Sequence, residues 1–550
     1  MKIIDGQLFK QMVICGANVL HNNFPEIDAL NVFPVPDGDT GTNMSLTFSS
    51  GASDIASMTT NSISEIAKKL SKGLLMGARG NSGVILSQIF RGIAQGLEGK
   101  DQVNAIEFAH ALTKGAEVAY RAVMRPTEGT ILTVIREAST DTSAYAKEDM
   151  EMDDLFSYFV ERAQVSLDHT PELLPVLKEV GVVDSGGAGL VLILSGFLAG
   201  LNGDMIERVE VVESASKESL VEVESDGEEG FGYCTEFIFR LDPRKAKSFT
   251  EDRLKTELAN IPGNSIVVVQ DEDIVKVHVH TLKPGNALNL AQRFGEFIKL
   301  KIENMQEQHN NIISNETVPA KKEEAPKVRE HKATAVISVA AGDGVKDLFL
   351  ELRCDEVVSG GQTMNPSAED IVAAVREVNA DNVIILPNNS NIVMTAQQAA
   401  IILEDEINVV VIPSKTIPQG LSACIMYNPE ADIETNIEEM NEAIANVKTG
   451  QVTFAIKDTN IDGVDIKAND YMALVEKKII ACIPDKVEAC KRALRELITE
   501  DDEIVTLIAG EDVLPDELEE ITSFLEREYE VEVEAHEGLQ PVYSFIIGVE

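Results

Sequence analysis

The stretch LNVFPVPDGDTGTNM, residues 30–44, determines how the first 200 residues of this chain are interpreted. Asp37 and Asp39 flank Gly38, and prolines at positions 34 and 36 stiffen the approach to them. Two carboxylates two positions apart on a constrained loop can face one hard cation, and magnesium prefers such oxygen ligands together with substrate phosphates. The alternative is an ordinary turn that caps a helix, for which Asp-Gly is a common dipeptide. The stretch therefore predicts either a magnesium site or a helix cap.

Residues that suit phosphate binding follow directly and recur in two further loops. Backbone amides and hydroxyls exposed at the start of a helix form an anion site. The first set is Thr40, Gly41, Thr42 and Asn43, which lead into a predicted helix. The second is GARGNSGVILSQ (77–88) with Asn81 and Ser82, and the third is GVVDSGGAGL (181–190) with Asp184, Ser185 and Gly186. One glycine-rich loop is a weak signal, but three that each open a helix favour a phosphate site over packing alone.

Composition limits the classes of partner and the cellular setting. A chain of 550 residues is expected to form about three domains. The formal charge of −45, from 92 acidic and 47 basic residues, disfavours nucleic acid and anionic membranes as partners. We find no apolar run of about 18 residues, so no transmembrane segment is expected. The six cysteines form no CxxC pair, which suits reduced thiols and a cytoplasmic location.

The apolar periodicity divides the chain into segments of different character. Residues 1–205 show helical spacing, and residues 231–314 shift toward a period of two, with a helix expected near 287–302. Residues 315–332 are rich in charge and proline and indicate a linker. Residues 333–550 alternate β-branched runs with helical segments, which predicts a parallel sheet. The expected fold is multidomain: an all-α N-terminal domain followed by two α/β domains, the middle one of α+β type.

The middle segment carries a candidate zinc site. In VKVHVHT, Val275, Val277 and Val279 share one face of a predicted strand, and His278 and His280 share the other. Two histidines so spaced can ligate one zinc ion, with Cys234 of another predicted strand as a thiolate ligand. The alternative is a solvated strand face beside an ordinary buried cysteine.

The C-terminal segment contains the loop GGQTMNPS (360–367). Thr363, Asn365 and Ser367 before a helix suit phosphate or carboxylate binding. A strand–turn–helix connection is the other interpretation, because Ser367 with Asp370 forms a capping-box pattern.

On these motifs the first domain resembles the ATP-binding subunit of the dihydroxyacetone kinase family. The whole chain, with VHVH and GGQTMNPS…LPNNSNI, resembles the catalytic subunit of bacterial fatty acid kinase. The resemblance implies a barrel of antiparallel helices that binds ATP and Mg²⁺ at one end, a middle domain that carries Zn²⁺, and a C-terminal domain similar to the fatty-acid carrier. That C-terminal domain would serve docking or dimerisation rather than catalysis.

The resemblance also assigns roles to individual residues. Asp37 and Asp39 would bind magnesium, and Asn31 would offer an amide oxygen near the position where the dihydroxyacetone enzymes have a third aspartate and this chain has Val32. The residues expected to contact nucleotide are Thr40, Gly41, Thr42, Asn43, Asn81, Ser82, Gly129, Thr130, Asp184, Ser185 and Gly186.

The expected reaction is transfer of the γ-phosphate of ATP to a fatty acid bound in a separate carrier protein. A carboxylate acceptor is already ionised and needs no general base, and none of the three loops contains a histidine. A homodimer is a further expectation. The rival functions are a kinase for a small polyol such as dihydroxyacetone, and a non-catalytic ATP-binding regulator.

Overall fold

The computed structural model describes residues 2–30, 38–123, 125–209, 233–241, 245, 249–258, 261, 263–271, 274–281, 283–304, 331–361, 364–461 and 463–550, and the structural statements below concern these residues. Contacts between residues divide the chain into two compact units. The larger unit comprises Met1–Val212 and Arg329–Glu550, and the smaller one comprises Glu213–Val328. The N-terminal and C-terminal parts of the chain thus belong to the same unit.

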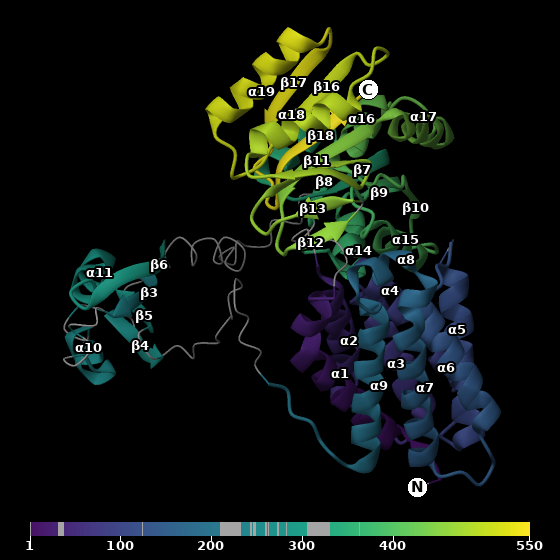
Figure 1. The fold of residues 1–550 in the computed structure, drawn as a ribbon. Helices are drawn as coiled ribbons and strands as arrows, with labels where there is room; N and C mark the ends of the chain where they lie inside the picture. Colours follow the sequence, from purple (N-terminus) through teal and green to yellow (C-terminus); the bar gives the residue numbers. More distant parts are fainter. Residues whose placement is uncertain are drawn as a thin grey trace, which may run out of the picture. The chain divides into compact units, whose positions relative to one another are not determined.

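The N-terminal part of the larger unit is helical (Figure 1). Its elements are β1 (Ile4–Asp5), α1 (Gly6–Asp28), α2 (Thr40–Ala56), α3 (Ile63–Met76), α4 (Gly80–Gly96), β2 (Gln102–Val103), α5 (Ala105–Ala122), α6 (Ile131–Tyr145), α7 (Met152–Leu173), α8 (Pro175–Val180) and α9 (Ser185–Asn202). From α1 to α8 each helix packs on the next, and α9 packs on both α1 and α7. The helical character expected for this part is confirmed, whereas its barrel form stays a prediction.

Local sequence sets where several of these helices begin. Asp5 caps α1, because its Oδ1 accepts a hydrogen bond of 2.9 Å from the Leu8 amide. Asn104 and Glu107 form a capping box at α5, with hydrogen bonds of 3.0 and 3.1 Å that satisfy two amides the helix leaves unpaired.

Aromatic rings and close helix contacts hold the core of this part together. The ring of Phe197 lies 6.2 Å from that of Phe9 and 6.3 Å from that of Phe48, and all three side chains are buried. Each such ring contributes about 1.5–3 kcal/mol by its burial. Helices α1 and α9 approach closely, because a Cβ built on Gly196 would lie 2.6 Å from the Gly16 Cα. Glycine is therefore required at this crossing.

The first residues of α2, α4, α6 and α9 lie at one end of the helical part (Figure 1). Successive helices run in opposite directions, so alternate helices begin at the same end. A Cβ on Gly80 would lie 2.6 Å from the Asn43 Nδ2, which places the first turns of α4 and α2 in contact. A Cβ on Gly186 would lie 3.3 Å from the Ile131 Cβ, which does the same for α9 and α6.

The C-terminal part begins with a parallel four-stranded sheet of order β10-β9-β7-β8. Its strands are β7 (Lys332–Ala340), β8 (Glu356–Ser359), β9 (Ala380–Leu386) and β10 (Asn408–Val411), with helices α13 (Asp343–Glu351), α14 (Ala368–Glu377), α15 (Val393–Ile402), α16 (Ile417–Met426) and α17 (Ile433–Asn446). The predicted capping box at α14 is confirmed, with hydrogen bonds of 2.7 and 3.1 Å between Ser367 and Asp370. Here the expected parallel α/β architecture is correct.

A second, six-stranded sheet follows, of order β15-β14-β11-β18-β16-β17. Its elements are β11 (Lys448–Phe454), β14 (Tyr471–Val475), β15 (Lys478–Ile483), β16 (Ile504–Ala509), β17 (Glu532–Glu537) and β18 (Tyr543–Val549), with helices α18 (Lys486–Leu497) and α19 (Pro515–Glu528) and a separate ribbon of β12 (Thr459–Ile461) and β13 (Val464–Ile466). Only β16 and β17 are parallel. The expectation of a parallel sheet is therefore wrong for this half. Glu476 and Lys477, both at positive φ, form a two-residue loop that only an antiparallel hairpin can use.

The smaller unit contains an antiparallel sheet of order β4-β5-β3-β6. Its elements are β3 (Tyr233–Leu241), α10 (Glu251–Leu258), β4 (Gly263–Asp271), β5 (Ile274–Thr281), α11 (Pro284–Ala291) and β6 (Gly295–Asn304). This is an α+β arrangement, and the α/β class does not apply to it. The helix expected near 287–302 is wrong beyond Ala291, because β6 pairs with β3 from Gly295 onward.

One described helix, α9, is long and apolar enough to cross a membrane by length and composition. The expectation that no such run exists was therefore too strict. In this structure α9 packs within the helical part, and 61% of the apolar window is buried there. That is the environment of a core helix.

Candidate nucleotide and phosphate site

Asp39 lies directly before α2 and contacts the C-terminal part of the chain. Its backbone oxygen accepts a hydrogen bond of 2.8 Å from the Asn43 amide, but its side chain does not cap the helix. Instead, its Oδ2 accepts a hydrogen bond from the Nδ2 of Asn365. The other two predicted magnesium ligands, Asp37 and Asn31, lie outside the described residues. The geometry of the predicted metal site is thus described for Asp39 alone.

A carboxylate that the sequence reasoning missed occupies the start of α2. The Asp28 Oδ1 accepts hydrogen bonds from the amides of Gly41, at 2.6 Å, and Thr42, at 3.2 Å. Its Oδ2 accepts a further bond of 2.7 Å from the Thr42 hydroxyl. A Cβ on Gly41 would lie 2.2 Å from the Phe24 oxygen, so the end of α1 is pressed against this turn. A phosphate that used these donors would have to displace Asp28.

Nothing in the sequence pattern marked Asp28 as part of this turn. It is the last residue of α1, eleven positions before Asp39, and it carries no local motif. Its role depends on how the end of α1 meets the start of α2, which is a tertiary contact.

The second loop brings Asn43 and Asn81 together at the start of α4. Gly80 adopts a φ of +58°, and a Cβ there would lie 2.6 Å from the Asn43 Nδ2 and 3.4 Å from the Asn365 Nδ2. Asn81 donates from Nδ2 to the Oδ1 of Asn391, at 3.2 Å. The Oδ1 of Asn81 is buried and has no hydrogen-bond partner among the described residues. Ser82 lies in the first turn of the same helix. Two amide side chains, those of Asn43 and Asn365, therefore lie against Gly80, and Asn81 follows it in the chain.

The third loop, at the start of α9, meets the loop before α6. The Asp184 Oδ2 caps α9 by accepting a hydrogen bond of 2.7 Å from the Gly187 amide. The residue is partly exposed, yet its carboxyl group is enclosed, and this burial raises its pKa to about 6 against the opposing effect of the amide hydrogen bonds. Gly129, at a φ of +82°, precedes Thr130 and α6. The structure thus groups Asp184, Gly186, Gly129 and Thr130 at the same end of the helical part as the other loops.

The described residues supply some, but not all, of the oxygen ligands that a hard divalent cation requires. No three His, Cys, Asp or Glu side chains among them lie close enough to hold a metal. Oxygen donors of other kinds are present, since the carboxylate of Asp39 adjoins the buried amide of Asn365, whose Oδ1 has no partner in the described part of the chain. Carboxylate and amide oxygens with retained waters are the usual environment of magnesium.

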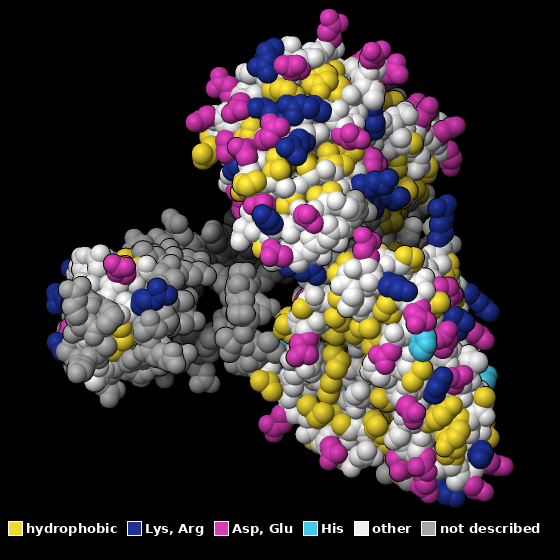
Figure 2. Space-filling model, viewed as in Figure 1, with side chains coloured by type: hydrophobic (Ala, Val, Ile, Leu, Met, Phe, Trp, Pro, Cys, Tyr) yellow, Lys and Arg dark blue, Asp and Glu magenta, His cyan; other side chains and the backbone are white. Residues whose placement is uncertain are grey.

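The negative surface of this protein repels an anionic ligand, so such a ligand needs hydrogen-bond donors or cations at its binding site. Figure 2 shows acidic side chains dispersed over the visible face of the larger unit, with lysine and arginine among them. This agrees with the formal charge of −45. A nucleotide held here depends on a cation and on backbone amides to offset that field.

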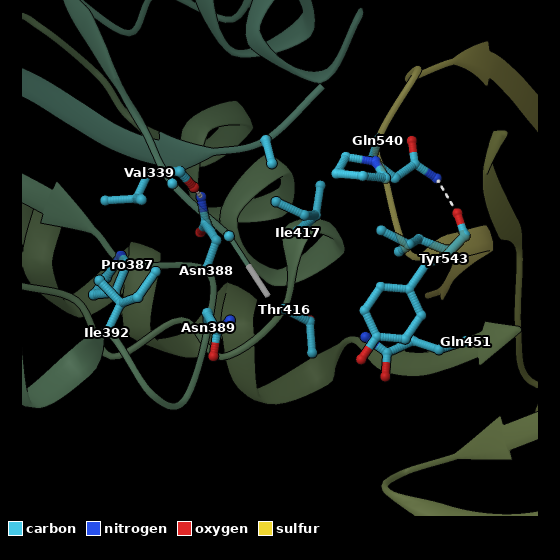
Figure 3. A pocket seen from close by; sticks show the side chains of 15 residues that line it. Val339, Pro387, Asn388, Asn389, Ile392, Thr416, Ile417, Gln451, Gln540 and Tyr543 are labelled. Atoms are coloured by element: carbon cyan, nitrogen blue, oxygen red, sulfur yellow. Dashed lines mark hydrogen bonds between the residues drawn. The ribbon is translucent and has the colours of Figure 1, made fainter. Parts of the chain in front are cut away.

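A separate cavity lies within the C-terminal part (Figure 3). Its volume is about 40 Å³, and it lies between the ends of β7 and β9 and the loop that precedes β18. Gln540 donates from Nε2 to the backbone carbonyl oxygen of Tyr543 at 3.1 Å. The Oε1 of Gln540 and the Nδ2 of Asn389 are buried and have no hydrogen-bond partner among the described residues. Gly360 and Gly361, at the start of the GGQTMNPS loop, also line it. Thr363 of that loop lies outside the described residues.

The predicted zinc ligands occupy matched positions in the smaller unit. In the antiparallel pair of β3 and β5, Cys234 lies opposite His280, and His278 is two positions along the same strand. Val275, Val277 and Val279 are buried in the core, as predicted for the other face of β5. The structure describes only the backbone of these three residues and not their side chains, so the zinc site stays a prediction.

Comparison with known proteins gives a consistent assignment over the chain. The DAK2 domain model matches residues 34–199. Models of FakA-like fatty acid kinase domains match residues 230–312, for the middle domain, and residues 335–550, for the C-terminal domain.

Full-length relatives show the same extent of similarity. Protein YloV of Bacillus subtilis (strain 168) is 49% identical over 561 residues, which cover 100% of both chains. A protein of Staphylococcus epidermidis is 45% identical over 555 residues, which cover 100% of this chain and 99% of that one.

Solved structures match more weakly. A DegV family protein of Corynebacterium glutamicum has 12% identity and a TM-score of 0.31, covering 40% of this chain and 97% of its own. The dihydroxyacetone kinase of C. freundii has 14% identity and a TM-score of 0.28, covering 40% and 48%. The three domain models and the full-length relatives carry the assignment, and the chain belongs to the FakA-like fatty acid kinase family, with a DAK2 domain, a middle domain and a C-terminal domain.

Proposed function

We propose that this protein is an ATP- and magnesium-dependent kinase that phosphorylates the carboxylate of a fatty acid bound in a separate carrier protein. The observation that carries the proposal is the convergence of four helix starts at one end of the helical part, with Asp39 among them. Membership of a family whose domains are a DAK2 domain and FakA-like middle and C-terminal domains supports it.

The chain's own groups would divide the work of phosphoryl transfer. Asp39, with the predicted ligands Asp37 and Asn31, would hold magnesium, which when bound neutralises charge on the phosphates. Amides at the start of α4 would donate hydrogen bonds to the phosphate oxygens of the nucleotide. The acceptor carboxylate is ionised at neutral pH, so the reaction needs positioning rather than proton removal.

Asp28 adds a competing carboxylate to this scheme. Because it already accepts from Gly41 and Thr42, those donors would reach phosphate only after Asp28 moves away. We therefore place the main phosphate contacts at the start of α4, which no side chain caps. The starts of α2 and α9 take a conditional share, because Asp28 and Asp184 already accept from backbone amides there.

The decisive experiment is incubation of the full chain with ATP, magnesium and a fatty-acid-loaded carrier, with hydroxylamine present to trap acyl phosphate. Acyl hydroxamate that requires all three components supports the proposal, and Asp39→Ala and Asp37→Ala should each abolish it. Product that survives both substitutions would overturn the assignment of these residues.

The rival functions have distinct outcomes in the same assay. Phosphorylation of dihydroxyacetone in place of hydroxamate formation would indicate a polyol kinase. The match of residues 335–550 to the FakA-like C-terminal domain counts against that alternative. Nucleotide binding with no transfer to either acceptor would indicate a regulator.

Zinc, the oligomeric state and the location of the protein belong to the proposal as well. We propose that Cys234, His278 and His280 bind zinc in the smaller unit. Metal analysis of the purified chain tests this, since His278→Ala with His280→Ala should remove the zinc.

The homodimer is tested by the mass of the protein in solution, and the cytoplasmic location by cell fractionation.

A further inference from the structure

The loop before α14 makes a continuous set of contacts with the loop before α4. Arg79 pairs with Ser367 in an isolated antiparallel bridge, and the Ala368 amide donates to the Ala78 oxygen at 3.1 Å. The Arg79 guanidinium donates to the backbone carbonyl oxygen of Asn365 at 2.9 Å and lies 3.7 Å from the Asp370 carboxylate. The C-terminal part is thus fixed, by backbone and side chains, on the loop predicted to bind phosphate.

Asn365 occupies the centre of this contact. Its side chain is only 2% exposed, and its Nδ2 donates to the Oδ2 of Asp39. A carboxylate is only an acceptor, so the amide nitrogen must face Asp39 and the amide oxygen must point elsewhere. That Oδ1 is buried and has no partner among the described residues. A buried acceptor without a donor destabilises a fold unless a ligand or water satisfies it.

The Oδ1 of Asn81, in the first turn of α4, is also buried and has no hydrogen-bond partner in the described part of the chain. The Asn365 oxygen, unpaired among the described residues, and the Asp39 carboxylate that the Asn365 nitrogen contacts form a set of acceptors. A hydrated divalent cation supplies what this set lacks, because the ion takes oxygen ligands and its waters donate hydrogen bonds.

We infer that the C-terminal domain completes the phosphate site of the helical domain, with Asn365 as a positioning residue that holds Asp39 and offers its amide oxygen to the hydrated cation. This inference rests on the proposed function. It assigns the C-terminal domain a share in cation binding, beyond the docking or dimerisation expected from the sequence.

The contacts farther along the interface allow a matched control. Gln88 donates to Gln398 at 2.7 Å, and both side chains are buried between α4 and α15. Gln398→Ala therefore loosens the same interface without touching Asp39. Asn365→Ala removes the contact with Asp39, and Asn365→Asp replaces it by a second carboxylate.

The first measurement is calorimetric binding of ADP to the full chain, with and without magnesium. Asn365→Ala should weaken the magnesium-dependent affinity about tenfold, the effect of losing one hydrogen bond to a charged group, and leave metal-free affinity unchanged. Gln398→Ala should leave both affinities close to those of the wild type. Equal magnesium dependence in Asn365→Ala and the wild type would overturn the inference.

The second measurement keeps the test independent of catalysis. In Asn365→Asp two carboxylates face each other and repel, and a divalent cation between them removes the repulsion. Magnesium should therefore raise the thermal midpoint of Asn365→Asp by several degrees more than that of the wild type or of Gln398→Ala. If the thermal midpoint of Asn365→Asp is lower than that of the wild type by the same amount with and without magnesium, Asn365 only supports the interface and the inference fails.

The outcomes also separate this inference from the proposed function. If the wild type binds magnesium nucleotide and forms acyl phosphate while Asn365→Ala matches it in every respect, the inference alone fails. If the wild type binds no magnesium nucleotide, the proposed function fails first.

Discussion

Replacement of Asp184 by Asn should make the protein more stable at neutral pH and should remove one pH dependence. Enclosure of the Asp184 carboxyl raises its pKa from 3.8 to about 6, and protonation is therefore favoured in the folded state. The stability that Asp184 contributes is fully present below pH 3.8, falls as the pH rises to about 6, and is constant above that value. A difference of about two pH units at 1.36 kcal/mol each corresponds to about 3 kcal/mol.

Asn should avoid this loss and keep the cap. The Oδ1 of Asn can accept the hydrogen bond from the Gly187 amide. Asn and Asp stabilise a helix about equally as the N-cap residue, which is the position of residue 184. The gain from Asp184→Asn should thus grow from near zero at about pH 4 to about 3 kcal/mol at about pH 7. Urea unfolding of both variants, followed by far-ultraviolet circular dichroism over this pH range, measures it.

Asp432 offers a matched control of opposite sign. It caps α17 by accepting from the Thr435 amide at 2.8 Å, and the hydrogen bonds to Thr435 lower its pKa. Its contribution is present above the normal pKa and is lost as the pH falls, so Asp432→Asn should remove stability at neutral pH. Parallel pH profiles for wild type and Asp184→Asn would refute the reasoning about the buried carboxyl.

Three further predictions concern packing and reactivity. Gly196→Ala should lower the free energy of unfolding by about 1–3 kcal/mol or more, because the new Cβ would meet the Gly16 backbone at 2.6 Å; urea unfolding measures it. Asp28→Ala should cost about 1–2 kcal/mol by leaving the Gly41 amide without its acceptor, and unchanged stability in the same assay would contradict that role. Cys490 is fully buried and burial raises the pKa of its thiol, so iodoacetamide should label it only in denaturant, as mass spectrometry of digested protein would show.

Local sequence predicted those features that depend on a few adjacent residues. The capping box at Ser367 and the buried valine face of β5 follow from spacing alone, and both are confirmed. The helix starts at Thr40, Gly80 and Ser185 also lie where the glycine-rich loops predicted them.

The errors arose where pairing partners, rather than local pattern, decide the structure. Residues after Ala291 have apolar side chains at spacings that suit a helix, but pairing with β3 makes them a strand from Gly295. In the second half of the C-terminal part, apolar runs of similar composition form antiparallel strands because tight loops such as Glu476–Lys477 join them. Composition does not distinguish these cases, because the antiparallel strand β18 is buried on both faces, as the strands of a parallel sheet usually are.

The candidate site shows the same division between local and distant information. The sequence motifs predict Asp39 and Asn81 as site residues, but the partners of these two side chains, Asn365 and Asn391, lie far along the chain, with separations of 326 and 310 positions. Short motifs contain no information about such contacts. The GGQTMNPS loop was interpreted as either a phosphate loop or a helix cap, and the structure shows the cap at Ser367 together with the contact to Asp39.

The contacts of Arg79 bear on how a nucleotide could be neutralised here. Its guanidinium donates to the backbone carbonyl oxygen of Asn365 and lies near Asp370, so this cation serves the contact between the two parts of the chain. On a protein with a formal charge of −45, phosphate binding then depends on backbone amides and on a divalent ion. Amides alone carry only partial charge, about half an elementary charge for a whole helix start. The proposed kinase should therefore depend strictly on a divalent cation, and loss of the acceptor groups around Asp39 should weaken nucleotide binding more than loss of any single phosphate contact.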